Sequence, residues 1–235
     1  MVVGNFAPEP QIESPAVGAL FDQRDTVKLV GSAHDEEDGA LPASALSWEV
    51  IALYSNEDGA QQQTVLTATG AEAEFPMTDG PLNWNSDLVY LVRLTATDSD
   101  GYSNTVEQTV RYTRLQAQIA DEFAGFFLAP TDDNDGELHA VASRPGDFIA
   151  WKDVNMTGRA PVFLRAKAQA GALIELRVDS PTGDLLANAS VPAGDNWSTV
   201  PLLFDPIEGV HDLYLVVSAI EQGEVAVNYI QVIGR

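Results

Sequence analysis

Short segments in which apolar and polar residues alternate recur along the whole chain, separated by glycine, proline, asparagine and aspartate. This period of two is typical of a β-strand with one buried face, and apolar residues at helical spacing are nearly absent. In the segment 89–96 the even-numbered side chains share the face that we expect to be buried: Tyr90, Val92, Leu94 and Ala96. The pattern therefore predicts an all-β protein built from β-sandwiches.

The alternation places a run of strands in each half of the chain. Those predicted for the first half are Thr26–Ala33, Leu46–Tyr54, Gln62–Thr69, Leu88–Thr97 and Thr105–Tyr112. Those predicted for the second half are Phe148–Trp151, Val162–Ala168, Leu173–Asp179, Leu185–Val191, Ser198–Phe204, Val210–Val217 and Val225–Ile233. The short polar stretch Thr113–Gln116 separates the two groups, so we predict one sandwich at residues 1–113 and a second at residues 114–235.

Charge limits the partners of the chain. The formal net charge is −23 at pH 7, and no stretch rich in lysine or arginine offsets it locally. Such a field repels nucleic acid and anionic lipid, so we expect neither a nucleic acid nor a membrane as a partner. The acidity suits a saline or calcium-rich medium, and simple solubility explains it equally well.

Missing features narrow the class of protein further. The sequence contains no cysteine, which excludes disulfides, thiolate catalysis and cysteine-based zinc sites. It has no apolar run as long as a membrane span, and residues 1–8 lack the basic and apolar regions of a signal peptide. We expect a segment of a longer secreted protein, extracellular or periplasmic, whose signal peptide lies outside this segment.

Two stretches of the first half carry a family resemblance. Residues 31–48 follow the pattern GSAxDxEDGxLxxxxLxW, and residues 94–101 read LTATDSDG. Both resemble bacterial PKD-type and related Ig-like domains, and the likeness spans about residues 7–113. It implies an Ig-like sandwich with Trp48 packed between its two sheets. In that family such domains are commonly spacers beside catalytic or sugar-binding modules.

Acidic residues of these two stretches have two interpretations. Calcium prefers several hard oxygen ligands, which two acidic loops at one end of a sandwich could supply. Alternatively, Asp-Gly pairs are turn residues whose side chains accept hydrogen bonds from their own backbone. The candidate calcium ligands are Asp35, Glu37, Asp38, Asp98 and Asp100.

The second half carries a more specific resemblance. Residues 146–151 read GDFIAW, close to the motif GDWIxY, and residues 174–186 read IELRVDSPTGDLL, close to the hairpin IELRLDSPTGxLL. Both motifs are similar to those of the family 6 carbohydrate-binding modules, over about residues 115–235. The resemblance implies a jelly roll of two antiparallel sheets that binds polysaccharide chains or their ends.

The family's usual cleft sandwiches a sugar between two aromatic side chains, because the C–H face of a pyranose packs on an aromatic plane. The first aromatic position falls on Ala142 and a cleft asparagine on Ala226, so both of those groups are missing here. The second aromatic position is matched by Trp197, on a polar Gly-Asp-Asn loop. Trp197 is therefore the best single candidate for contact with a sugar.

The family's second site lies on the concave face of a sheet and uses the aromatic residue of the GDW motif. Phe148 occupies that position, with Ala150 on the same face and Trp151 on the opposite, core-facing side. Phe148 is either a second sugar-binding residue or a half-buried strand residue.

A structural calcium site of the family uses two glutamates near the start of the module and an aspartate in the last strand. The matching residues here are Gln116, Gln118 and Asn228, so all three carboxylates are replaced by neutral amides. We predict no metal at this position, because loss of the ion would otherwise leave carboxylates crowded together. The acidic stretch Asp132–Glu137 is expected to be a solvated loop.

No catalytic motif is present. His34, His139 and His211 are scattered, and the chain has no nucleophile elbow, phosphate loop or dinucleotide fingerprint. We therefore expect a non-catalytic carbohydrate-binding region of a larger secreted bacterial enzyme, which it holds on a polysaccharide. The alternatives are a structural spacer or protein–protein interaction module whose sugar site has degenerated, and adhesion to a cell surface.

Overall fold

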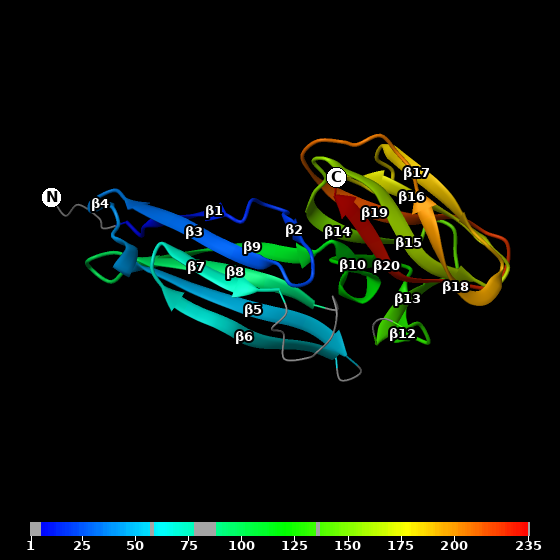
Figure 1. Ribbon diagram of the computed structural model, residues 1–235, viewed down its shortest axis with the longest axis horizontal. Helices are drawn as coiled ribbons and strands as arrows, with labels where there is room; N and C mark the ends of the chain where they lie inside the picture. Colours follow the sequence, from blue (N-terminus) through cyan, green and yellow to red (C-terminus); the bar gives the residue numbers. More distant parts are fainter. Residues whose placement is uncertain (1–5, 57–58, 78–87, 135–136, 235) are drawn as a thin grey trace.

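A computed structural model describes residues 6–56, 59–77, 88–134 and 137–234, and most of them lie in β-strands. The helices among these residues are two short 3-10 turns, η1 (Ala43–Ala45) and η2 (Ala117–Ile119). In this part of the chain no helix has the length and apolar character needed to cross a lipid bilayer. Figure 1 shows two β-lobes arranged end to end, with β9 leading into β10 between them. The predicted all-β class with two β-sandwiches is confirmed.

The first sandwich contains two sheets. Its strands are β1 (Glu9–Ser14), β2 (Leu20–Phe21), β3 (Thr26–Asp35), β4 (Gly39–Ala40), β5 (Leu46–Asn56), β6 (Gly59–Thr69), β7 (Glu72–Pro76), β8 (Leu88–Thr97) and β9 (Ser103–Tyr112). One sheet has the order β1-β3-β4, with β7 also pairing β3, and the other has the order β2-β9-β8-β5-β6. β2 runs parallel to β9, whereas the long pairs β5–β6, β5–β8 and β8–β9 are antiparallel.

A tryptophan organises the core of this sandwich. The alternation predicted for β8 is confirmed, since its even-numbered residues from 88 to 96 are all buried. Trp48 packs among them, as predicted, and its Nε1 donates a hydrogen bond of 2.9 Å to the carbonyl oxygen of Gly70. Gly31 lies against the ring, because a Cβ at this position would be 2.8 Å from Trp48 Cζ2 and 2.5 Å from Leu94 Cδ2. The PKD-type or Ig-like family of this half stays a prediction.

The second sandwich also contains two sheets. Its strands are β10 (Arg114–Gln116), β11 (Glu122–Ala124), β12 (Phe127–Pro130), β13 (Leu138–Ala142), β14 (Phe148–Asn155), β15 (Arg159–Ala168), β16 (Ala172–Val178), β17 (Leu185–Val191), β18 (Gly194–Leu202), β19 (Val210–Ile220) and β20 (Val225–Gly234). The six-stranded sheet has the order β12-β13-β20-β15-β18, with β10 also pairing β20. The five-stranded sheet has the order β11-β14-β19-β16-β17.

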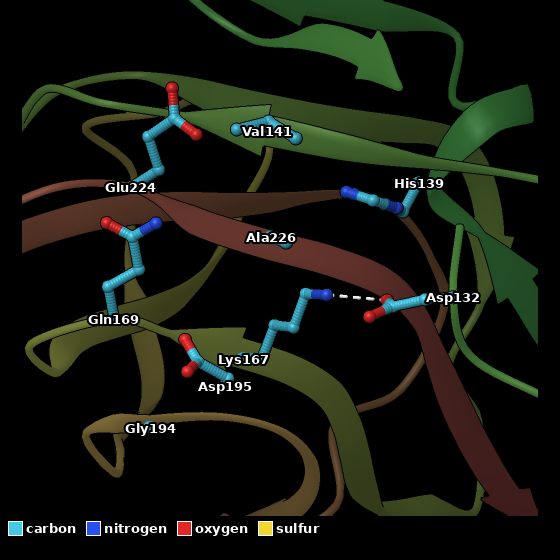
Figure 2. A pocket seen from close by; sticks show the side chains of 9 residues that line it. All are labelled: Asp132, His139, Val141, Lys167, Gln169, Gly194, Asp195, Glu224 and Ala226. Carbon is cyan, nitrogen blue, oxygen red and sulfur yellow. Dashed lines mark hydrogen bonds and ion pairs between the residues drawn. The ribbon is translucent and has the colours of Figure 1, made fainter. Parts of the chain in front are cut away.

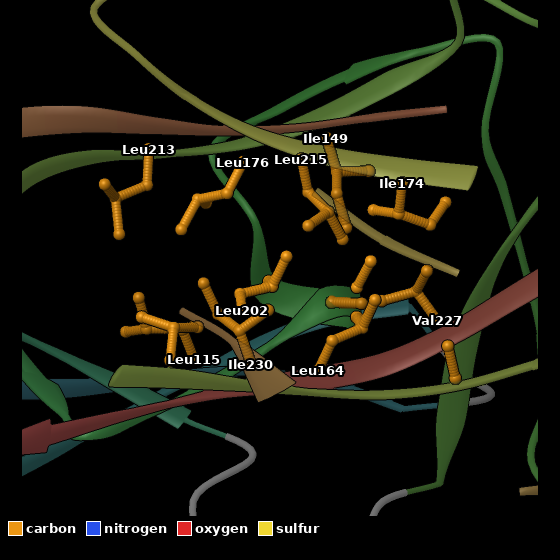
Figure 3. Close-up of a cluster of buried hydrophobic side chains, with 14 of the residues drawn as sticks. Leu115, Ile149, Leu164, Ile174, Leu176, Leu202, Leu213, Leu215, Val227 and Ile230 are labelled. Carbon is orange, nitrogen blue, oxygen red and sulfur yellow. The ribbon is translucent and has the colours of Figure 1, made fainter. Parts of the chain in front are cut away.

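Leucine, isoleucine and valine side chains from both sheets meet between them. Figure 3 shows Leu176 and Leu213 of one sheet facing Leu164 and Ile230 of the other across this core. Trp151 is fully buried in the same cluster, as predicted, and its Nε1 donates a hydrogen bond of 3.0 Å to the carbonyl oxygen of Gln116. The core therefore joins the two sheets as an apolar layer, which is the arrangement expected of packed sheets.

The predicted hairpin between β16 and β17 is present. The amide of Gly183 donates a hydrogen bond of 3.0 Å to the carbonyl oxygen of Ser180. A Cβ at Gly183 would lie 2.0 Å from the carbonyl oxygen of Val178, so the turn has no room for a side chain there. Arg177 Nη1 also donates to the carbonyl oxygen of Gly183 at 2.7 Å, which ties the turn to its own strand.

Several observed strands differ from the predicted ones, and two of the differences matter most for the candidate site. The strand predicted at Ser198–Phe204 begins at Gly194, so Trp197 lies inside β18 and not in a loop. β13 was not predicted, because all five of its residues are buried and the strand has no alternation to detect. The division of the chain at residues 113 and 114 stays a prediction.

Candidate carbohydrate-binding surfaces

Strand alternation places one set of side chains on the outer face of the six-stranded sheet. The core-facing residues of its three central strands are Ala140, Ala142, Val162, Leu164, Ala166, Ala168, Val225, Val227, Ile230 and Val232. Neighbours of these residues along the same strands, Val141, Ala226 and Lys167, point to the outer face. Loops and polar side chains can therefore form a binding surface on this face.

A cavity of about 360 Å³ opens on this outer face. Its volume lies at the lower end of the ~300–1,000 Å³ typical of pockets for small ligands. It is lined by Asp132, His139, Val141, Lys167, Gln169, Gly194, Asp195, Glu224 and Ala226. Figure 2 shows Ala226 at the floor, with Glu224, Gln169 and Asp195 on one side and His139 on the other. Most of the lining can donate to or accept from sugar hydroxyls.

Trp197 borders this cavity and is held by three of its lining residues. Its Nε1 donates a hydrogen bond of 2.8 Å to Asp132 Oδ1, and its ring meets that of His139 edge-on, with centroids 5.3 Å apart. Lys167 Nζ lies 4.7 Å from the centroid of the indole ring. These contacts hold the indole next to the cavity, with a cation over one face of the ring. Its role as a sugar-binding residue stays a prediction.

Hydrogen bonds and burial set the charges in the cavity. Lys167 Nζ lies 2.5 Å from Asp132 Oδ1. The hydrogen bonds from Lys167 and Trp197 lower the pKa of Asp132 to about 2, so this carboxylate is ionised at neutral pH. Burial and the charge of Lys167 lower the pKa of His139, which is therefore neutral at pH 7. An uncharged imidazole, a paired ammonium and carboxylates thus surround the cavity.

The two positions at which the family's cleft residues are missing differ in the structure. Ala226 lines the cavity, so the loss of an asparagine there does remove a polar group from its floor. Ala142 is fully buried in the core, and its neighbour Val141 lines the cavity instead. The interpretation of Ala142 as a cleft position is therefore wrong, because its side chain faces the other side of the sheet.

Phe148 lies on the outer face of the five-stranded sheet, on a different surface from the cavity. It packs against a small buried cluster of Ala150, Tyr214 and Val216, and its ring centroid is 5.4 Å from that of Tyr214. Lys152 Nζ lies 4.5 Å from the centroid of the Tyr214 ring. Phe148 is half-buried, as one interpretation predicts, and its role in binding sugar stays a prediction. The sequence did not indicate Tyr214 as part of this surface, because Tyr214 comes next to Ala150 only through the pairing of strands β14 and β19.

A buried polar layer continues from the cavity along the same sheet. Arg165 donates two hydrogen bonds to Asp133, from Nε at 2.8 Å and from Nη2 at 2.7 Å, and Asn228 Nδ2 donates a third at 2.9 Å. Burial acts to raise the pKa of Asp133, but these hydrogen bonds outweigh it and hold the pKa below its usual range. The expectation of a solvated loop at 132–137 is therefore wrong for Asp133; residues 135 and 136 lie outside the described residues.

The three amides at the family's calcium position are all buried in or beside this layer. Gln118 Oε1 accepts a hydrogen bond of 2.7 Å from the amide of Leu138, and Asn228 is tied to Asp133. Amide oxygens carry no charge to offset a divalent ion, and the guanidinium of Arg165 adds a positive charge next to Asn228. These residues fit a cation poorly. The absence of a metal here stays a prediction.

The acidic residues of the first sandwich mainly cap their own turns. Asp35 Oδ1 accepts hydrogen bonds from the amides of Glu37 and Asp38, at 2.9 and 2.8 Å. Asp98 Oδ1 accepts from the amides of Asp100 and Tyr102, at 2.9 and 2.8 Å. These are the contacts that the turn interpretation predicts.

Two features of these loops are compatible with the calcium interpretation. Asp38 Oδ2 accepts a hydrogen bond of 3.0 Å from the amide of Ser99, which joins the two acidic loops and lowers the pKa of Asp38. Asp35 Oδ2 is buried and has no hydrogen-bond partner among the described residues. Within the same residues no three acidic or histidine side chains gather in a metal-binding arrangement. Calcium at this end of the sandwich stays a prediction, and it would need backbone oxygens as further ligands.

Known proteins resemble the second half of the chain. The sequence profile described as carbohydrate binding module (family 6) matches residues 116–234. An arabinoxylan arabinofuranohydrolase of Paenibacillus polymyxa is 31% identical over 113 residues, which cover 45% of this chain and 18% of that protein. This chain thus spans a small part of the curated relative.

Two solved structures are similar over the same half. A β-1,3-glucan-binding family 6 module from Bacillus halodurans is 28% identical with a TM-score of 0.47, over 51% of this chain and 93% of that one. A family 6 module from Clostridium cellulolyticum, solved in complex with xylose, is 23% identical with a TM-score of 0.46, over 51% of this chain and 95% of that one.

Proposed function

Because this chain belongs to the family 6 carbohydrate-binding modules, we propose that it is a non-catalytic region that holds a larger secreted enzyme on a polysaccharide. The observation that carries the proposal is the cavity beside Trp197 on the six-stranded sheet. Its lining combines carboxylates, an amide, an amine and an imidazole, which together can donate to and accept from the hydroxyls of a sugar. The ligand is therefore a hydroxyl-rich glycan.

The parent protein is proposed to be a polysaccharide-degrading enzyme. The curated relative is an arabinoxylan arabinofuranohydrolase of which the matched region is 18%, so the rest of such a protein is available for catalysis. A module bound to the same polymer makes the encounter between catalytic domain and substrate intramolecular, which raises the local substrate concentration. We propose that the parent protein is extracellular or periplasmic, because a large polysaccharide is met outside the cytoplasm.

A structural role is the second candidate function, and a specific observation favours it. Lys167 covers one face of the Trp197 ring, and the indole N–H already donates to Asp132. A sugar that stacks on that face would have to displace the ammonium, which costs the ion pair with Asp132. If the cavity binds no glycan, the module is a spacer or a protein–protein contact.

Binding measurements with three variants separate these functions. Wild type is titrated with arabinoxylan, a β-1,3-glucan and cello-oligosaccharides by calorimetry. We expect measurable binding to one of these neutral glycans, and at least a roughly tenfold loss in Trp197→Ala, because aromatic contacts supply much of the affinity of such sites. Phe148→Ala tests the second surface in the same way.

Tyr102→Ala is the matched control, since Tyr102 is an exposed aromatic residue of the first sandwich. Its affinity should equal that of wild type. Circular dichroism of each variant shows that the fold is retained. No binding by wild type to any of the glycans would contradict the proposed function and favour the spacer.

A further inference from the structure

The two sandwiches meet without a linker. Thr113 alone separates β9 from β10, and it is buried. The amide of Val232, in the last strand of the chain, donates a hydrogen bond of 2.8 Å to the carbonyl oxygen of Thr113, and Gln231 Nε2 donates to Thr113 Oγ1 at 3.0 Å. Thr113 Oγ1 in turn donates to Asp22 Oδ1 at 2.7 Å. The connecting residue is thus bonded to both sandwiches.

The segment before β2 makes a second contact between backbones. The amide of Asn155 donates a hydrogen bond of 2.9 Å to the carbonyl oxygen of Gly18. Gly18 has a φ of +70°, and a Cβ there would lie 2.2 Å from the carbonyl oxygen of Asp153. Leu20 is buried within the hydrophobic cluster of the second sandwich, and Arg159 Nη2 donates to its carbonyl oxygen at 3.1 Å. The first sandwich therefore contributes a side chain to the core of the second.

An ion pair with a buried arginine and a half-buried aspartate is the third contact. Arg111 of β9 has a side chain that is 7% exposed, and its Nη2 lies 2.6 and 2.7 Å from the two carboxylate oxygens of Asp121. Asp121 Oδ2 also accepts a hydrogen bond of 2.7 Å from the amide of Lys152. The pair therefore links β9 of the first sandwich to the segment before β11 of the second, and loss of Asp121 would leave the buried guanidinium of Arg111 without this partner.

From these contacts we propose that the first sandwich is a rigid support for the carbohydrate-binding sandwich, and that the two form one folding and tumbling unit. Domains joined by small polar interfaces and exposed linkers ordinarily move relative to each other. Here a buried one-residue connection, a shared core side chain and a partly buried ion pair replace the linker. This support would hold the cavity of the second sandwich in one orientation relative to the first sandwich.

Wild-type protein without any glycan provides the first test. ¹⁵N relaxation is measured for backbone amides of the full chain, and scanning calorimetry follows its thermal unfolding. We expect the same rotational correlation time for both sandwiches and a single unfolding transition. Two separate correlation times would overturn the proposal. This test does not depend on glycan binding, so its failure is distinguishable from failure of the proposed function.

A pair of glycine variants provides the second test. Gly18→Ala adds a methyl group between the two backbones, whereas Gly39→Ala adds one at a similar φ of +72° with no heavy atom within 4 Å. Both variants carry the strain of a left-handed alanine. The added methyl group meets the second sandwich only at Gly18, so we expect only Gly18→Ala to split the unfolding transition in two. Equal behaviour of the two variants would overturn the proposal.

If Gly18→Ala fails to fold, the ion pair supplies a milder variant. Arg111→Met is compared with Arg93→Met, which removes the more exposed ion pairs of Arg93 with Glu49 and Glu107 in the same sandwich. We expect the Arg111 variant alone to give different correlation times for the two sandwiches. A single correlation time in both variants, with equal unfolding midpoints, would overturn the proposal.

Discussion

Asn228 donates a hydrogen bond of 2.9 Å to a carboxylate oxygen of Asp133 at a position where relatives of this module are expected to hold a cation. Asn228 is fully buried. Its hydrogen bond and those of Arg165 lower the pKa of Asp133, so this carboxylate is ionised at neutral pH. The amide of Asn228 and the guanidinium of Arg165 are thus both hydrogen-bond partners of one buried carboxylate.

Asn228→Asp should therefore destabilise the protein strongly. The variant places a second carboxylate next to Asp133 and loses the hydrogen bond, and we expect a loss of about 3 kcal/mol in the free energy of unfolding at pH 7. Urea unfolding measures the change. Asn104→Asp, at an exposed position whose Oδ1 accepts from the amide of Thr105, is the control and should change stability little. Wild-type stability of Asn228→Asp without calcium would show that this electrostatic account is wrong.

The charges of the cavity predict discrimination against acidic sugars. Asp132, Asp195 and Glu224 line it, and Lys167, the ammonium among the described lining residues, is already paired with Asp132. We expect neutral glycans to bind better than chains that carry uronic acids. In Asp195→Asn/Glu224→Gln the affinity for a glucuronate-bearing xylan should rise roughly fivefold at low salt, as expected for partly exposed charges.

The control for this change is Glu9→Gln/Glu74→Gln, which alters the net charge equally at exposed positions of the first sandwich. It should leave the affinity for the acidic glycan as it is. An equal rise in both double variants would mean that the whole surface, and not the cavity, governs the selectivity.

Stability should depend on pH through His211. Its Nδ1 lies 3.1 Å from Asp179 Oδ2 and its Nε2 lies 3.0 Å from the carbonyl oxygen of Glu208, an arrangement that uses both nitrogens as donors only in the protonated ring. Burial acts to lower the pKa of His211, but the Glu208 carbonyl and the Asp179 carboxylate outweigh it and raise the pKa. A raised pKa in the folded state means that the proton is bound more tightly after folding.

The stabilising effect of this contact is thus fully present below about pH 6.5, the ordinary pKa of histidine. It is lost as the pH rises through the higher pKa of the folded state. We expect the melting temperature to fall over this range more in wild type than in His211→Asn. His34→Asn, at an exposed position of the first sandwich, should follow wild type. Parallel curves for wild type and His211→Asn would rule out this role.

Gly31→Ala should destabilise the first sandwich, because its methyl group would overlap the ring of Trp48 and a methyl group of Leu94. Overpacking of this kind typically costs about 1–3 kcal/mol, which urea unfolding measures. Gly234→Ala is the control, since a Cβ there would meet Arg159 Nη1 at an ordinary 3.5 Å. Equal stability of the two variants would contradict the packing described here.

Much of the fold could be predicted from alternation, while much of the candidate site could not. The strand Leu88–Thr97 was predicted to the residue because one of its faces is buried and the other is not. β13 gave no such signal, because both of its faces are covered. His139 and Lys167 belong to strands far apart in the sequence, so only the sheet order brings them to one cavity.

Trp197 shows the same limit at a single residue. The polar residues before it suggest a loop, yet they continue β18 along the edge of the sheet. Its partner Asp132 lies 65 residues away, a pairing that neither composition nor local spacing indicates. Burial and charge pairing across strands, which depend on the finished sheet, decide what the indole contacts.

The hairpin at Gly183 bears on how modules of this kind diversify. The hairpin of residues 174–186, one of the stretches that resemble the family, lies in the five-stranded sheet, and its turn has no space for a side chain at Gly183. The cavity lies on the other sheet and shares none of those residues. Substitutions in the cavity wall can therefore alter the shape and the charge of the cavity while this hairpin stays unchanged.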